Sequence, residues 1–126
     1  MKKNNPEDIT ILVVDDEDEF KEVLREVFQM AGYACLTASN GLEALKILDR
    51  KNVDVLVTDI VMPGMDGIKL TETVKKKYDC HVVMMTGYVK DFTRKDALAK
   101  GASEFINKPL DIRKLLELVK SLPRKR

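Results

Sequence analysis

The stretch from Val53 to Gly67, which reads VDVLVTDIVMPGMDG, decides the fold of this chain. Its apolar run Val55-Leu56-Val57 has no polar alternation and is rich in β-branched residues, which is typical of a central strand covered on both faces of a parallel sheet. A single carboxylate, Asp59, ends the run, and proline and glycine residues then predict a tight turn. An isolated aspartate at a strand end most often starts a turn or caps a helix, so the rest of the chain must decide whether Asp59 has a chemical role.

The composition indicates one globular domain over residues 1–126, with an ordered core from about residue 8 to residue 122. The hydrophobic fraction of 44% is ordinary for such a domain. The 22 lysines and arginines nearly balance the 21 aspartates and glutamates, which gives no reason to expect direct binding to nucleic acid or to a membrane. The apolar runs are too short to span a bilayer and no signal-peptide core is present, so we expect a cytoplasmic protein.

The cysteines and the histidine are interpreted as structural residues. Cys35 and Cys80 lie far apart without a Cys-x-x-Cys pattern, and His81 is the only histidine. These three residues do not have the spacing of a zinc site.

Strand and helix patterns alternate five times along the chain. We expect strands at residues 10–14, 33–38, 55–59, 81–85 and 103–106, and helices at residues 20–31, 39–52, 68–78, 91–100 and 112–122. In the first helix Gly32 marks the C-terminal end, and the predicted apolar face consists of Phe20, Val23, Leu24, Val27, Phe28 and Ala31. In the second helix we expect Leu42, Leu45 and Leu48 to face the core. The fourth helix has little apolar content, so we expect it to be weakly anchored.

Five successive strand–helix units predict an α/β fold, a doubly wound parallel sheet with helices on both faces. In such a fold the carboxyl ends of all strands lie along one edge, where ligands bind. Polar residues stand at four of the five expected strand ends, namely Asp15 and Asp16, Asp59, Thr86, and Lys108. We therefore expect three carboxylates, one hydroxyl and one ammonium group to converge.

The carboxylates Asp15, Asp16 and Asp59 would repel one another strongly unless a divalent cation or raised pKa values relieved the crowding. Oxygen ligands at a hydrated site suit Mg²⁺ rather than a softer metal. The next two acids, Glu17 and Asp18, are interpreted as residues that cap the following helix or complement its dipole. Other interpretations remain open for Lys108 as a solvated lysine and for Thr86 as a hydroxyl that bonds the backbone.

Four short motifs stand in order on these strand ends: VVDDE at residues 13–17, DIVMPGMDG at 59–67, MTG at 85–87 and GASEFINKP at 101–109. Together they resemble the receiver domain of two-component response regulators, and the resemblance covers nearly the whole chain. It implies a flavodoxin-like sheet of five strands in the order 2-1-3-4-5, with five helices.

The resemblance also implies a role for each site residue. Asp59 is then the phosphoacceptor, and Mg²⁺, with Mn²⁺ as a second candidate, is held by Asp15, Asp16, Asp59 and the backbone carbonyl of Val61. Lys108 contacts the phosphoryl group, and Thr86 together with Phe105 reports its presence. A cis peptide bond at Lys108-Pro109 is implied as well.

The partners implied by the resemblance are a sensor histidine kinase or a histidine phosphotransfer protein as donor, and a downstream protein or output domain as target. A dimer that forms on phosphorylation belongs to the same set. The chain is then a regulatory domain rather than an enzyme in its own right, although it promotes its own phosphorylation and dephosphorylation. The surface of the fourth helix, fifth strand and fifth helix is the expected output face, used either by the chain alone or within a longer regulator.

Two further residues, Val61 and Tyr88, lie two positions after Asp59 and Thr86. Our hypothesis is that their bulk and apolarity slow attack by water and prolong the phosphorylated state.

Three other classes of protein were weighed against this interpretation. A phosphohydrolase of the haloacid dehalogenase class requires Asp-x-Asp, which Asp59-Ile-Val does not supply. A flavin or nucleotide module requires a phosphate loop rich in glycine, serine and threonine after the first strand, where this chain has four acids that would repel such a ligand. The third alternative is a module with the receiver fold that binds partners without being phosphorylated.

Overall fold

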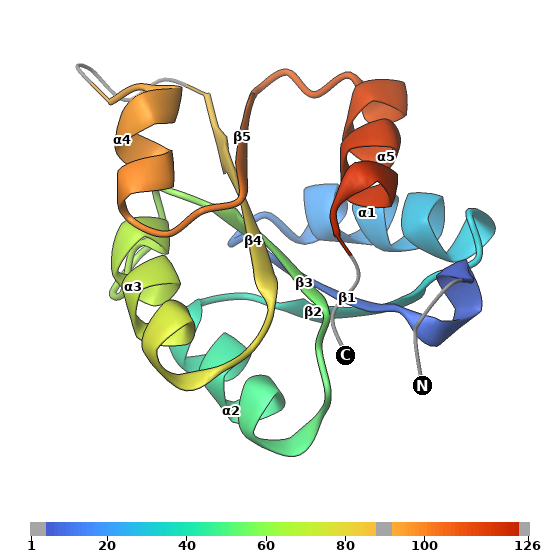
Figure 1. Ribbon diagram of the computed structural model, residues 1–126, viewed down its shortest axis with the longest axis horizontal. Helices are drawn as coiled ribbons and strands as arrows, with labels where there is room; N and C mark the ends of the chain where they lie inside the picture. Colours follow the sequence, from blue (N-terminus) through green and yellow to red (C-terminus); the bar gives the residue numbers. More distant parts are fainter. Residues whose placement is uncertain (1–4, 88–91, 124–126) are drawn as a thin grey trace.

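The computed structural model describes residues 5–87 and 92–123 of the chain. Its sheet has five parallel strands in the order β2-β1-β3-β4-β5, as predicted (Figure 1). The strands are β1 (Thr10–Val14), β2 (Ala34–Ala38), β3 (Val55–Asp59), β4 (His81–Thr86) and β5 (Glu104–Asn107). A short 3₁₀ turn, η1 (Pro6–Asp8), precedes β1. The central strand β3 is buried along its whole length, as its unbroken apolar sequence predicts.

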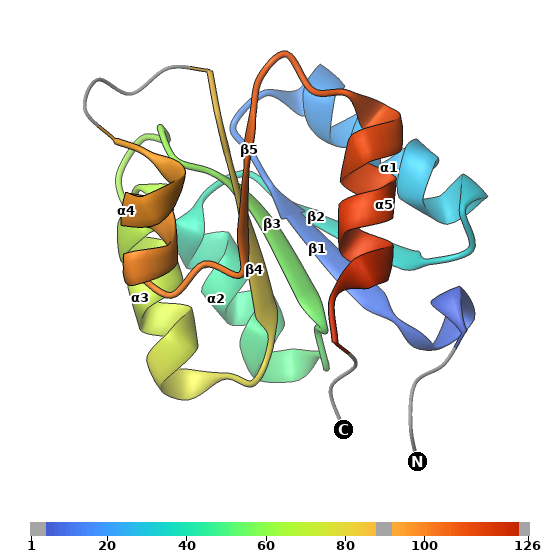
Figure 2. The ribbon, with the colours of Figure 1, turned by 45° about the horizontal axis from the view of Figure 1, so that its top comes forward.

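Helices cover both faces of the sheet. They are α1 (Asp18–Met30), α2 (Gly41–Arg50), α3 (Gly67–Lys77), α4 (Arg94–Ala99) and α5 (Ile112–Ser121). Figures 1 and 2 show α1 and α5 on one face and α2, α3 and α4 on the other. Each face has its own apolar core, and the largest buried side chains on the α1 and α5 face include Phe28, Leu24 and Leu115. Within the described ranges no helix is long and apolar enough to cross a membrane.

Local signals in the sequence fix most helix ends. Gly32 follows α1 with a φ of 99°, a left-handed conformation that suits glycine at this position. The Asn40 side chain accepts a hydrogen bond from the Glu43 backbone N–H at the start of α2, at 2.9 Å. The Asp66 side chain does the same for the Lys69 N–H at the start of α3, at 2.8 Å. These caps satisfy backbone donors that the first turn leaves free.

The predicted apolar faces of α1 and α2 were too wide. Val23 is 51% exposed and Leu42 is 64% exposed, and Ala31 is also exposed. The buried residues of α2 are Gly41, Ala44 and Leu48, which follow one stripe along the helix, and Leu42 lies about 100° away from Gly41 around the helix axis. The sheet therefore buries a narrower stripe than the spacing of apolar residues suggested.

Helix α4 is shorter than the predicted range 91–100 because a capping box defines its start. The Thr93 side chain and the Asp96 side chain each bond the backbone N–H of the other residue, so helical residues begin at Arg94. Only Ala97 of this helix is buried. The first predicted position, residue 91, lies outside the described ranges. The expectation of weak anchoring agrees with this small buried surface.

Candidate functional site

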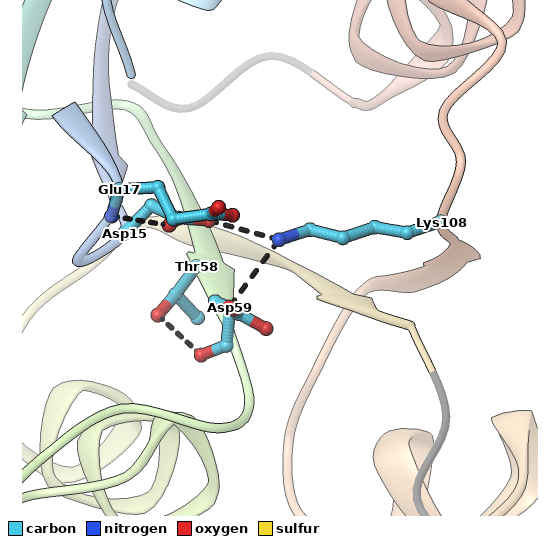
Figure 3. Close-up of polar contacts among 5 residues, drawn as sticks. All are labelled: Asp15, Glu17, Thr58, Asp59 and Lys108. Atoms are coloured by element: carbon cyan, nitrogen blue, oxygen red, sulfur yellow. Dashed lines mark hydrogen bonds and ion pairs between the residues drawn. The ribbon is translucent and has the colours of Figure 1, made fainter. Parts of the chain in front are cut away.

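The polar residues at the strand ends come together at one edge of the sheet. Asp15 follows β1, Asp59 is the last residue of β3, Thr86 is the last residue of β4, and Lys108 follows β5. The parallel register aligns these ends, since Asp59 pairs with Met85 and Thr86 pairs with Asn107. The sequence prediction that these side chains converge is therefore confirmed for the carboxylates and the ammonium group (Figure 3).

The Lys108 ammonium group bridges two carboxylates. Its Nζ lies 3.0 Å from Asp15 Oδ2 and 3.3 Å from Asp59 Oδ2. Asp15 is fully buried and Asp59 nearly so, whereas the Lys108 side chain keeps 19% of its surface exposed. Lys108 is thus a partner of the buried carboxylates and not a freely solvated lysine. The Lys108-Pro109 bond that precedes α5 is cis, as expected.

The two oxygens of Asp15 have different partners. Oδ2 accepts from Lys108, while Oδ1 accepts from the backbone N–H of Glu17 at 2.9 Å (Figure 3). Glu17 stands at the N-cap of α1, but its side chain makes no capping hydrogen bond. The Glu17 side chain therefore does not cap the helix, and its place at the N-cap leaves only the second predicted role, in which its charge complements the helix dipole. Asp18 lies in the first turn of α1 as expected, and it pairs with Lys21 at 3.1 Å.

Three carboxylates are close enough to hold one cation. One oxygen each of Asp15, Asp16 and Asp59 lie within 4.8 Å of one another, and Asp16 is exposed to solvent while the other two are buried. The single Lys108 charge leaves this cluster with an excess of negative charge. Hard oxygen donors with one side open to water fit Mg²⁺, which retains several waters when bound.

Burial raises the pKa of the Asp59 carboxyl above its ordinary value, and the negative charge of Asp15 acts in the same direction. The ammonium group of Lys108 opposes this rise without cancelling it. Burial would lower the pKa of Lys108, but the hydrogen bond that Lys108 donates to Asp15 and the charges of Asp15 and Asp59 raise the pKa instead. The site therefore holds a protonated lysine beside a carboxylate that burial destabilises, which favours any cation or reaction that relieves the charge.

The start of α3 packs tightly against the backbone of Asp59. A Cβ atom on Gly67 would lie 2.0 Å from the Asp59 carbonyl oxygen, so the start of α3 approaches this backbone in a way that only glycine allows. The same carbonyl oxygen accepts a hydrogen bond from Thr58 Oγ1 at 3.0 Å. The loop that follows β3 is also held in place, because the backbone N–H of Ile60 donates to Met85 O at 3.0 Å. These contacts hold the Asp59 carboxylate at a defined place at the strand end.

The Thr86 hydroxyl is buried and has no hydrogen-bond partner among the residues that the structure describes. The alternative interpretation, in which this hydroxyl bonds the backbone, therefore has no support within the described ranges. Phe105 is half-buried, and its ring lies beside that of Phe92 with centroids 6.1 Å apart. A buried hydroxyl without a partner is costly, and it is available to a ligand that enters the site.

The structure leaves two of the predicted roles open. Val61 lies in the loop after β3 with its side chain 64% exposed, so this side chain is accessible beside the site. The proposed ligation by its carbonyl remains a prediction. Tyr88 lies outside the described residues.

Sequence reasoning missed one neighbour of the site. The Lys108 Nζ lies 4.4 Å from the centroid of the Phe20 ring, a cation–π contact. Phe20 was assigned to the apolar face of α1, and helical spacing carries no sign of a contact with a lysine at the far end of the chain.

A model of the response regulator receiver domain matches residues 11–120. The chain belongs to the response regulator receiver domain family. This receiver is 31% identical over 123 residues to the probable transcriptional regulator ycf27 of Cyanidium caldarium, an alignment that covers 98% of this chain and 49% of the relative. It is 31% identical over 117 residues to the heme response regulator HssR of Staphylococcus aureus strain Newman, covering 93% of this chain and 52% of the relative. The receiver thus spans about half the length of these curated relatives.

Solved structures of receivers resemble this one in fold. The response regulator TrrA of Thermotoga maritima, in complex with Mg²⁺ and beryllium fluoride, aligns with a TM-score of 0.81 at 37% identity over 91% of this chain and 99% of that chain. The chemotaxis protein CheY4 of Vibrio cholerae aligns with a TM-score of 0.83 at 27% identity over 91% of this chain and 98% of that chain. This receiver is therefore a signalling domain of the two-component class, in the same fold as these proteins.

Proposed function

We propose that this receiver is a phosphoacceptor in which Asp59 takes a phosphoryl group from a phosphohistidine in a Mg²⁺-dependent reaction. One observation carries the proposal: the Asp59 carboxylate ends the buried central strand beside Asp15 and Asp16 and accepts a hydrogen bond from the Lys108 ammonium group at 3.3 Å. TrrA, a similar receiver, binds Mg²⁺ together with beryllium fluoride, which supports a cation at the corresponding acidic site.

In the proposed reaction a carboxylate oxygen of Asp59 attacks the phosphorus of the donor. The new O–P bond forms as the N–P bond breaks, and the departing imidazole recovers its electron pair and takes up a proton. When bound, Mg²⁺ neutralises charge on the transferring oxygens, and Asp15, Asp16, Asp59 and the Val61 carbonyl are the ligands we assign to it. Positioning and charge neutralisation account for most of the catalysis in reactions of this kind.

Lys108 has the role of a cation beside the transferred group. Its Nζ already lies between Asp15 and Asp59, so a short movement of the side chain would bring it to a phosphoryl oxygen on Asp59. The contact is charge-assisted and hence stronger than a neutral hydrogen bond. The same ammonium group relieves the repulsion among the carboxylates before the reaction.

Thr86 is proposed to sense the phosphoryl group. Its buried hydroxyl has no partner among the described residues, and a phosphoryl oxygen on Asp59 would offer one. Formation of this bond draws the end of β4 inward and opens space for the half-buried Phe105 ring, a shift between two packings. The surface formed by α4, β5 and α5 changes as the Phe105 ring moves. Because α4 is weakly anchored, this change requires little free energy.

The partners follow from this chemistry. We propose a sensor histidine kinase or histidine phosphotransfer protein as the donor in the cytoplasm, and a downstream protein, an output domain or a second receiver as the target. Val61 and Tyr88 are proposed to slow hydrolysis of the phosphorylated Asp59, and separate substitutions Val61→Ala and Tyr88→Ala that leave the decay rate unchanged would each refute that role.

The test uses Mg²⁺ and acetyl phosphate, with intact mass as the readout. We expect the protein to gain one phosphoryl group, the Asp59→Asn variant to gain none, and the Asp54→Asn variant to react normally. Asp54 is a matched control because it is a second buried aspartate beside the same strand, where its carboxylate accepts from Thr10 N–H at 2.9 Å. An unmodified wild-type protein would instead favour the receiver-fold module that binds partners without phosphorylation.

A further inference from the structure

We propose that Phe20 is a positioning residue that holds the Lys108 ammonium group at Asp15 and Asp59; the inference rests on the phosphoacceptor function proposed above. The centroid of the Phe20 ring lies 4.4 Å from Lys108 Nζ. Attraction between an ammonium group and the face of an aromatic ring is electrostatic and grows as water is excluded. The ring is therefore a third neighbour of the ammonium group, in addition to the two carboxylates.

The fold explains how this contact arises. Phe20 is the third residue of α1, the helix that begins directly after Asp15 and Asp16. Its half-buried ring packs against the apolar cluster that α1 and α5 share on one face of the sheet. Lys108 comes from the opposite end of the chain, after β5. The connection from β1 to α1 thus supplies two of the proposed cation ligands, Asp15 and Asp16, and the first turn of α1 supplies the ring beside the ammonium group.

The contact matters because lysine is a flexible group that must act at a defined place. Its four-carbon stem has many rotamers, and ordering them costs conformational entropy. With 19% of the side chain exposed, Lys108 retains access to water and to other orientations. The Phe20 ring occupies space beside Nζ that water would otherwise fill. Its attraction for the ammonium group stabilises the lysine orientation that points to Asp59. Phosphoryl transfer depends strongly on such positioning.

A plain core role for Phe20 makes a different prediction. A core residue is replaced acceptably by another apolar side chain of similar volume, whereas a ring that binds a cation is replaced only by another ring. Phe20→Leu and Phe20→Tyr separate the two roles. Phe28→Leu is the matched control, since Phe28 is a fully buried ring of the same helix and the same apolar cluster, eight residues after Phe20 and beside Tyr33.

The experiment measures the initial rate of phosphorylation by acetyl phosphate at saturating Mg²⁺, with far-UV circular dichroism to establish that each variant is folded. We expect Phe20→Leu to lower the rate roughly three- to tenfold, the range that a partly desolvated cation–π contact allows. Phe20→Tyr and Phe28→Leu should stay within about twofold of the wild type. Equal rates for Phe20→Leu and the wild type, or equal losses for the leucine and tyrosine variants, would overturn the inference.

A second readout separates this inference from the proposed function. In the wild type and Phe20→Tyr, the ring current should shift the ε-methylene protons of Lys108 upfield in NMR spectra, and Phe20→Leu should abolish the shift and increase the mobility of that side chain. If the wild type takes no phosphoryl group, the proposed function fails and the NMR spectra still decide whether the ring holds the lysine. Absence of the upfield shift in the wild type would contradict the inference by itself.

Discussion

A Cβ atom placed on Gly67 would lie 2.0 Å from the carbonyl oxygen of Asp59, closer than any side chain can approach. The first residue of α3 therefore packs directly on the backbone of the residue whose carboxylate the site is built around. We expect Gly67→Ala to lower the free energy of unfolding by about 1–3 kcal/mol, because the helix or the strand end must move. Urea unfolding measures the change.

The control for this prediction is Gly87→Ala. A Cβ at Gly87 would meet no other atom of the described residues within 4 Å, and its backbone is not left-handed. The substitution should change the free energy of unfolding by less than about 1 kcal/mol. Equal effects at both glycines would show that the close approach at Gly67 does not constrain the fold.

Removal of the buried Thr86 hydroxyl is expected to stabilise the protein, whereas most substitutions of buried residues destabilise it. Because it has no partner within the described ranges, Thr86→Val should raise the free energy of unfolding of the unphosphorylated protein by about 1 kcal/mol. Thr71→Val is the matched control, since the buried Thr71 hydroxyl donates to Gly67 O at 2.7 Å and its loss should cost about 1 kcal/mol. A loss of stability in both variants would show that the Thr86 hydroxyl has a partner in solution.

The sequence predicted the order of elements and the convergence of Asp15, Asp59 and Lys108, since parallel strands bring their carboxyl ends to one edge whatever the details of packing. It could not predict which apolar residues of a helix stay exposed. Leu42 satisfies the helical spacing as well as Leu48 does, but only the stripe through Gly41, Ala44 and Leu48 is fully buried in α2, and Leu42 is exposed. That selection depends on how each helix is rotated against the sheet, which no local pattern encodes.

The contacts that refine the site were also beyond local patterns. Glu17 was expected to cap α1 or to complement its dipole; its side chain makes no capping hydrogen bond, and its backbone N–H donates to Asp15. The contact between Phe20 and Lys108 joins opposite ends of the chain, and the lack of a partner for the Thr86 hydroxyl within the described ranges depends on how the neighbouring strands pack. Motifs identify the residues of this site, but three-dimensional packing determines their partners.

Because the pKa of Asp59 is raised, the effect of substituting Asp59 on the free energy of unfolding depends on pH. Burial makes the native state hold this proton more strongly than the unfolded chain does, so ionisation of Asp59 lowers the free energy of unfolding as the pH rises through the native pKa. In EDTA, Asp59→Asn should therefore be more stable than the wild type at neutral pH. The difference should shrink as the pH falls through the native pKa and vanish below the ordinary value of 3.8. Thermal unfolding at a series of pH values tests this, and a difference independent of pH would contradict it.

Mg²⁺ should stabilise the protein by binding the carboxylate cluster. At a concentration of one hundred times its dissociation constant, a ligand specific for the native state adds about 2.7 kcal/mol to the free energy of unfolding. Asp16→Asn should weaken Mg²⁺ binding at least about tenfold, because it removes the exposed carboxylate of the cluster. Glu19→Gln is the control, since Glu19 is an exposed acid in the first turn of α1, three residues after Asp16, and does not belong to the cluster. Equal shifts in the midpoint of thermal unfolding for both variants would indicate nonspecific screening.

The most direct test of the account is to identify the residue that carries the phosphoryl group. Borohydride reduces an acyl phosphate to an alcohol and releases phosphate, which converts a phosphorylated aspartate to homoserine. After incubation with Mg²⁺ and acetyl phosphate, reduction and peptide sequencing by mass spectrometry should find homoserine at position 59 and aspartate at positions 15, 16 and 54. Homoserine at another position, or unchanged aspartate at position 59 in a protein that has gained a phosphoryl group, would contradict the assignment of Asp59 as the phosphoacceptor.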